Sequence, residues 1–182
     1  VFGVAKKSRY LPLYSVSGLW RAKEEKFLRN VRWLSELSLR ASYGIQGNID
    51  KNTSPYLIGT YQRTTILPGN VESVISTETA PNPDLKWEKT SNVNLGLDFA
   101  ILKNRIRLGI DYYYRKSSDL ISSRKLPLET GFAYTSVNWA SMKNEGWEIS
   151  LNTQNIKTKD LSWTTSVNLG FNTNEVLNET DL

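Results

Sequence analysis

Residues 92–115, NVNLGLDFAILKNRIRLGIDYYYR, decide the fold because apolar and polar side chains alternate through both halves of this stretch. A period of two places successive side chains on opposite faces of a β-strand. In the first half the apolar positions are odd-numbered: Val93, Leu95, Leu97, Phe99 and Ile101. In the second half they are even-numbered: Ile106, Leu108, Ile110, Tyr112 and Tyr114. The stretch therefore predicts two amphipathic strands that follow each other closely.

A turn centred on Lys103 and Asn104 would join these strands into a hairpin. It would pair Ile101 with Ile106, and every apolar residue further out would then meet another apolar residue. The polar pairs would be Asp98 with Gly109, Gly96 with Asp111, Asn94 with Tyr113, and Asn92 with Arg115. A slip of one residue would mix the two faces, so the pattern fixes the register. Asn104 suits the turn because asparagine tolerates the left-handed backbone conformation.

The same alternation recurs elsewhere in the chain. It is clear in residues 37–43, 147–152 and 163–171, and weaker in residues 11–21 and 137–142. Residues 23–30 could form a helix of about one turn. We therefore predict an all-β fold of antiparallel strands.

The connections between the predicted strands differ greatly in length. Residues 103–104 and 155–160 are short, whereas 47–87 and 120–136 are long and polar. Outer-membrane β-barrels have short periplasmic turns and long extracellular loops, and their strands cross the bilayer with about 9 to 11 residues. Aromatic residues near the strand ends fit the girdles of such a barrel: Trp87, Tyr112, Tyr114, Trp147 and Trp163. The sequence thus predicts part of a transmembrane barrel in contact with the lipid bilayer, with both long loops extracellular.

Composition excludes several kinds of chemistry. The chain contains 0 Cys and 0 His, so it predicts no disulfide, no metal site with His or Cys ligands and no Ser-His-Asp triad. Its net charge of +5 is spread along the chain without a basic stripe, which argues against nucleic acid as a partner. No export signal and no long apolar run is visible. We expect neither enzymatic activity nor a cofactor or metal.

Five motifs in order closely resemble the C-terminal barrel of the SusC/RagA family. They are LSLRASYGIQGN (37–48), NPDLKWEKTSNVNLGLDF (82–99), RIRLGIDYYYRKSSDLI (105–121), LPLETGF (126–132) and MKNEGWEISLNT (142–153). Members of this family are TonB-linked outer-membrane transporters of Bacteroidota. The resemblance implies a barrel of about 22 strands, of which residues 1–182 would supply about six or seven. It also implies an N-terminal plug, absent here, that couples to the TonB complex, and a SusD-like surface lipoprotein as a lid.

Asp98 and Asp111 are the first candidate site, because the predicted register puts both on one polar face. Two carboxylates about 5 to 10 Å apart could be the acid and base of a glycosidase. The alternative, which we favour, is a hydrophilic barrel lumen lined by Asn94, Asp98, Asp111, Tyr113 and Arg115.

Aromatic residues in the two long segments are the second candidate site. Tyr56, Tyr61, Phe132 and Tyr134 could stack on sugars, hold peptides or contact the lid, although ordinary loop packing is equally consistent with them. Two functions follow. One is a TonB-dependent importer of oligosaccharides or peptides, and the other is a soluble β-sandwich module that binds carbohydrate or protein. They differ in what covers the apolar face.

Overall fold

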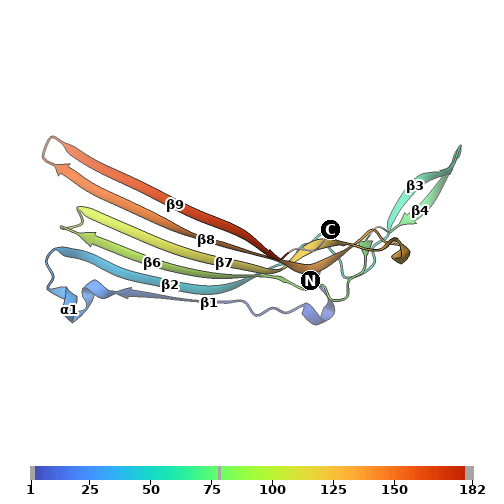
Figure 1. The fold of residues 1–182 in the computed structure, drawn as a ribbon, viewed down its shortest axis with the longest axis horizontal. Helices are drawn as coiled ribbons and strands as arrows, with labels where there is room; N and C mark the ends of the chain where they lie inside the picture. Colours follow the sequence, from blue (N-terminus) through green and yellow to red (C-terminus); the bar gives the residue numbers. More distant parts are fainter. Residues whose placement is uncertain (1–2, 78, 179–182) are drawn as a thin grey trace.

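Six long antiparallel strands form one twisted layer in the computed structural model, which describes residues 3–77 and 79–178 (Figure 1). They are β1 (Tyr14–Arg21), β2 (Leu34–Asn48), β6 (Glu88–Ile101), β7 (Ile106–Lys125), β8 (Tyr134–Lys157) and β9 (Ser162–Asn178). Their order in the sheet follows their order in the chain, and the short β5 (Thr79–Ala80) adds a parallel pairing to the start of β8. The predicted all-β antiparallel fold is confirmed.

A separate hairpin projects beyond one end of this sheet (Figure 1). It consists of β3 (Thr60–Leu67) and β4 (Asn70–Ser76), which pair only with each other. The helical elements are short: η1 (Lys6–Ser8), η2 (Ala22–Glu24), α1 (Lys26–Arg29) and η3 (Leu128–Thr130). Within the described residues, no helix has the length and apolarity needed to cross a membrane.

The hairpin of β6 and β7 has the register that the sequence predicts. Ile101 pairs with Ile106, Leu97 with Ile110 and Asn92 with Arg115. The Arg105 amide donates to the Leu102 carbonyl at 3.2 Å, which closes a turn centred on Lys103 and Asn104. Leu102, Lys103 and Asn104 are all left-handed, with φ of 53°, 57° and 67°. This conformation matches the right-handed twist of the flanking strands.

Strand pairing extends the two faces of this hairpin across the sheet. One row of partners is apolar throughout: Leu39, Leu97, Ile110, Ile149 and Leu169. The next row, on the opposite face, contains Arg40, Gly96, Asp111, Glu148 and Gly170. Because the period of two persists in each strand, one face of the layer is apolar and the other polar.

The apolar face has no second protein layer against it. Leu95 is 48% exposed and Leu169 is 51% exposed, and the buried hydrophobic residues among those described are few: Val4, Ala5, Ala22, Leu34, Leu85 and Ala100. A sandwich would bury these side chains between two sheets. The arrangement therefore fits a wall that turns its apolar face to lipid and does not favour the soluble β-sandwich.

Aromatic side chains flank the aliphatic rows of this face. Near the end with the long connections, the Tyr112 and Trp147 rings pack at a tilt with their centroids 4.7 Å apart, and the ring centroids of Tyr14 and Tyr43 lie 6.1 Å apart. Near the short turns, Trp20 and Trp163 are about half exposed. Aromatic girdles of outer-membrane barrels occupy these two levels.

The prediction of long loops at 47–87 and 120–136 is wrong in part. Residues 47–87 contain the β3–β4 hairpin, and β7 and β8 continue through most of the second segment, so that only residues 126–133 connect them. A bulge in β7 explains why the sequence pattern did not predict this extension. Asp119 is left-handed with φ 58°, and the pairing register shifts between Ser117 and Ile121, which interrupts the period of two.

Two shorter elements also differ from the prediction. The expected short strand at 137–142 is an internal part of β8, and the expected helix at 23–30 is divided into η2 and α1. The turn expected at 155–160 is shifted to residues 158–161 because β8 continues to Lys157.

Replacing Leu97 or Ile110 with Arg in the intact barrel should lower the free energy of unfolding by about 2 to 4 kcal/mol, because both side chains lie in the middle of the apolar rows. Asn94→Arg, on the opposite face, should cost far less. Folding equilibria in phospholipid vesicles would measure both. Equal costs on the two faces would contradict the assignment of the apolar face to lipid.

Candidate functional site

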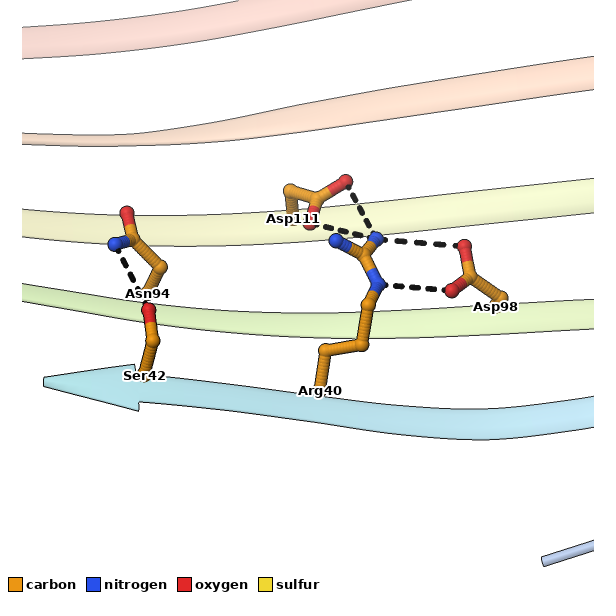
Figure 2. A network of polar contacts seen from close by, with 5 residues as sticks. All are labelled: Arg40, Ser42, Asn94, Asp98 and Asp111. Carbon is orange, nitrogen blue, oxygen red and sulfur yellow. Dashed lines mark hydrogen bonds and ion pairs between the residues drawn. The ribbon is translucent and has the colours of Figure 1, made fainter. Parts of the chain in front are cut away.

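An ion-pair network lies at the middle of the polar face (Figure 2). Arg40 of β2 reaches between Asp98 of β6 and Asp111 of β7. Its Nε donates to Asp98 Oδ2 at 2.8 Å, and its Nη2 donates to Asp111 Oδ1 at 2.9 Å. All three side chains are between 37% and 46% exposed, so the network is open to water.

Gly96 makes this network possible. It occupies the position between Arg40 and Asp111 in the row across the sheet. A Cβ atom there would lie 2.7 Å from Arg40 Cζ and 2.7 Å from Asp111 Oδ1. The absence of a side chain therefore leaves the space through which Arg40 crosses β6.

The two carboxylates do not have the arrangement of a glycosidase pair. Such a pair needs one carboxyl that holds a proton and one that does not. Here the Arg40 guanidinium lies between the two carboxylates and bonds both, so it occupies the space in which the substrate of such a pair would lie. Sequence reasoning placed Asp98 and Asp111 on one face correctly but missed Arg40, because it did not pair β2 with β6.

An amide-rich groove adjoins the network on the side of the long connections. It has a volume of about 790 Å³, and its lining includes Ser42, Gln46, Asn92, Asn94 and Tyr113. Asn94 Nδ2 donates to Ser42 Oγ at 3.2 Å, and Arg115 Nε donates to Asn92 Oδ1 at 2.9 Å. Four of the five predicted polar-face residues line this groove: Asn94, Asp111, Tyr113 and Arg115. The fifth, Asp98, accepts a hydrogen bond from Arg40, which is itself part of the lining.

A second glycine shapes the groove. Gly146 of β8 lies between Tyr113 and Asn172 in the pairing, and a Cβ atom there would lie 2.6 Å from the Tyr113 hydroxyl. The Tyr113 side chain can therefore lie across β8, where its hydroxyl accepts a hydrogen bond from Asn172 Nδ2. Asn172 also donates to Asn144 Oδ1 at 3.2 Å, which extends the amide surface onto β9.

Residues 79–88 fasten the long segment before β6 to the extension of β7 and β8. The Asn138 side chain is central: its Oδ1 accepts from the Lys86 amide at 2.8 Å, and its Nδ2 donates to the carbonyls of Lys86 and Asp119 at 2.8 and 2.7 Å. Lys86 Nζ also pairs with Asp119 at 2.7 Å, and Glu88 accepts from the Ile121 amide at 2.9 Å. Side chains thus bridge the irregular backbone left by the bulge.

The same residues hold the segment before β1. Leu85 is fully buried, and its carbonyl accepts from the Ala5 amide at 2.9 Å. Lys7 forms an ion pair with Asp84, and Trp87 Nε1 donates to the Arg9 carbonyl at 3.3 Å. We call residues 3–9, 79–88 and 119–138 the end module. Its contacts predict that these segments behave as one ordered unit.

The four predicted aromatic contact residues lie on different elements. Tyr61 belongs to β3 and is 70% exposed, and Tyr56, in the connection before it, is 60% exposed. Tyr134 begins β8 and is 48% exposed, whereas Phe132 precedes it in the short connection and is half-buried. All four belong to the end of the sheet that carries the long connections, but they come from separate segments.

Within 3–77 and 79–178, no group of three or more His, Cys, Asp or Glu side chains could hold a metal ion.

Comparison with known proteins agrees with this geometry. A family model described as TonB dependent receptor-like, beta-barrel matches residues 8–181. The chain belongs to the TonB-dependent receptor-like β-barrel family. Its sequence is 40% identical over 177 residues to the TonB-dependent receptor SusC of Bacteroides thetaiotaomicron, and 34% identical over 179 residues to the TonB-dependent receptor P26 of Formosa agariphila. These alignments cover 94% and 97% of the chain.

Solved structures of the same family share the fold. The RagAB peptide importer in its closed-closed state superposes with a TM-score of 0.81 at 31% identity over 98% of the chain, and in its open-open state with 0.79 at 32% identity over 96%. The SusC/RagA resemblance is confirmed, and so is the assignment to an outer-membrane barrel. The chain spans 18% of the length of SusC and 19% of the RagAB chain, so it corresponds to about a fifth of such a receptor.

Substituting Asn138 with Ala in the full-length receptor should loosen the end module, because three hydrogen bonds to backbone atoms are lost at a partly buried site. We expect a local cost of about 1 to 3 kcal/mol. Hydrogen exchange of the amides of residues 79–88 would measure it. Asn70→Ala is the matched control, since Asn70 bonds only the exposed Glu72 side chain among the described contacts. Unchanged exchange in Asn138→Ala would contradict this role.

Proposed function

We propose that this chain forms barrel wall and extracellular loops of a TonB-dependent outer-membrane importer for oligosaccharides or peptides. The observation that carries the proposal is the single layer with one apolar and one polar face, in a chain of this receptor family. The apolar face contacts lipid. The polar face, with Asn94, Asp98, Asp111, Tyr113 and Arg115, lines the aqueous lumen.

The energy for import comes from the TonB complex in this proposal. The relatives are named as TonB-dependent receptors, and the chain spans about a fifth of their length. TonB acts on the N-terminal plug implied by the resemblance, and the strands described here form a passive wall. Transport then requires no catalytic group on the polar face.

The end with the long connections faces the cell exterior in this proposal. Loop lengths support this orientation, since residues 49–87 connect β2 to β6 there, whereas the connections at the other end are all much shorter: residues 22–33, 102–105 and 158–161. The β3–β4 hairpin and the aromatic residues Tyr56, Tyr61, Phe132 and Tyr134 are then positioned to meet substrate or a SusD-like lipoprotein. Exposed aromatic rings suit either contact.

The orientation can be tested with single cysteines, because the chain has 0 native Cys. A cysteine in place of Thr130, between β7 and β8, should react with a membrane-impermeant maleimide on whole cells. A cysteine in place of Asn104, in the β6–β7 turn, should react only after the outer membrane is permeabilised. Both positions are exposed, so accessibility within the protein is matched. The reverse result would invert the topology.

Transport itself can be tested in cells that depend on the full-length receptor for uptake of its nutrient. Inactivating TonB should abolish uptake, and deleting part of residues 126–132 should weaken capture at the surface or closure of the lid while the barrel still inserts. A deletion confined to residues 128–131 leaves the long strands intact, since it keeps Leu126 and Ala133, which are joined by a backbone hydrogen bond of 3.0 Å. Uptake that continues without TonB would overturn the proposal.

A further inference from the structure

We infer that the short-turn end of the sheet binds the head groups of anionic phospholipids in the periplasmic leaflet of the outer membrane. The binding surface consists of the three connections at that end, residues 22–33, 102–105 and 158–161 (Figure 1). The inference rests on the proposed function, because it takes the apolar face to be covered by lipid and this end to be periplasmic. It adds a binding surface and the chemical class of lipid that fits it.

Basic residues from distant parts of the sequence meet at this end. The three connections contain seven basic and three acidic residues, so their net charge is +4, whereas the whole chain of 182 residues has a net charge of +5. The basic residues are Lys23, Lys26, Arg29, Arg32, Lys103, Arg105 and Lys159, and the acidic residues are Glu24, Glu25 and Asp160. The fold thus gathers positive charge that is dispersed along the sequence.

Both acidic side chains of residues 22–33 already have partners beside them. Glu24 lies 3.6 Å from the Arg21 guanidinium, and Glu25 Oε1 accepts a hydrogen bond from Trp20 Nε1 at 3.1 Å. By contrast, three exposed basic side chains of this connection form no ion pair within residues 3–77 and 79–178: Lys26, Arg29 and Arg32. Their charges are therefore available to an anion from outside the chain. Phosphate suits them, since arginine offers a planar fork of donors and lysine a compact ammonium group.

A lysine within the connection holds these residues in place. Lys23 Nζ donates to the backbone carbonyls of Leu28, Arg29 and Val31 at 2.9, 3.1 and 2.8 Å. Ala22, at the start of the connection, is buried. Residues 22–33 are therefore an ordered turn, so little backbone order has to be gained when a ligand binds.

Trp20 links this surface to the lipid-facing wall. It pairs with Leu39 in the apolar row that also contains Leu97, so its indole lies on the apolar face. The hydrogen bond from this indole to Glu25 brings the start of α1 to the same face. Tryptophan side chains are enriched where the hydrocarbon of a bilayer meets its head groups. The free basic side chains that follow Glu25 are therefore placed at the level of the head groups.

Two further aromatic side chains adjoin the free cations. Phe27 is 69% exposed and follows Lys26, and the exposed Trp33 follows Arg32. A lipid surface accommodates both kinds of side chain, because the aromatic ring enters the interface while the cation meets a phosphate. An anionic phospholipid fits better than a zwitterionic one, whose own cation offsets its phosphate. The exposed rings also favour a lipid over a soluble acidic protein.

The test uses the full-length receptor in nanodiscs of phosphatidylcholine. A donor dye is attached to a cysteine in place of Asn30, which is exposed between Arg29 and Arg32, after any cysteine elsewhere in the receptor is replaced by serine. A small fraction of either phosphatidylglycerol or phosphatidylcholine carries an acceptor dye on an acyl chain, so that the head group stays native. We expect more energy transfer to phosphatidylglycerol at low salt and a smaller difference at high salt, because salt screens exposed charges.

Replacing Lys26, Arg29 and Arg32 together with Gln should lower the relative affinity for phosphatidylglycerol at least about fivefold, since one cation near an anionic surface contributes about that factor. The matched control replaces three exposed basic residues at the other end of the sheet with Gln, which changes the net charge equally: Lys51, Arg63 and Lys125. It should leave the preference unchanged. Heat-modifiable migration on gels checks that each variant is folded.

Equal transfer to the two lipids at low salt would overturn the inference and leave the importer proposal standing, since TonB-dependent uptake is measured separately. With equal transfer, a cross-link from position 30 to an acidic periplasmic protein would assign the surface to that protein instead. A preference that persists in the variant of Lys26, Arg29 and Arg32 would overturn the assignment to this surface. Labelling of Asn104→Cys on intact cells would overturn the proposed orientation, and with it the assignment to the periplasmic leaflet, even if the preference in nanodiscs remained.

Discussion

The alternation of apolar and polar side chains within a single layer of strands is the constraint on which the rest of this structure depends. A lone sheet with one apolar face is stable only where something other than water covers that face. Here Leu39, Leu97, Ile110, Ile149 and Leu169 form a continuous row across the sheet, and no second sheet packs on it within the described residues. Lipid provides that cover in an outer-membrane barrel, and water wets the other face.

The same constraint fixes the polar network. Once β2, β6 and β7 are neighbours, a slip of one residue would move apolar side chains to the wrong face, so the alternation keeps Arg40, Asp98 and Asp111 on the same polar face. Gly96 then provides the opening through which Arg40 reaches β7. The ion pairs contribute little stability at this exposure, about 1 kcal/mol or less each. At this level of the wall one guanidinium bonds two carboxylates, and the adjoining groove is lined by both charged and amide side chains.

Sequence reasoning succeeded where interactions are local in the chain. The β6–β7 hairpin was predicted residue by residue because a four-residue turn joins two strands with strict alternation. The partnership of Arg40 with Asp98 was missed because 39 residues separate β2 from β6, and alternation alone does not say which strands are neighbours. The extension of β7 and β8 was missed because the bulge at Asp119 breaks the pattern. Asn138 was not singled out for a related reason, since its three partners are backbone atoms of distant segments that carry no side-chain signature.

The wall and the end module are held together by different interactions. In the wall, the structure is determined by backbone hydrogen bonds between strands and by the apolar side chains that face lipid. Side chains on the polar face can therefore change without affecting the strands that carry them. In the end module, by contrast, side chains such as Asn138 and Asp119 replace the interrupted ladder, so a substitution there alters the backbone itself. Substitutions at groove positions such as Gln46 and Asn94 therefore carry little structural cost. The end module must keep its bonding residues in order to remain a unit.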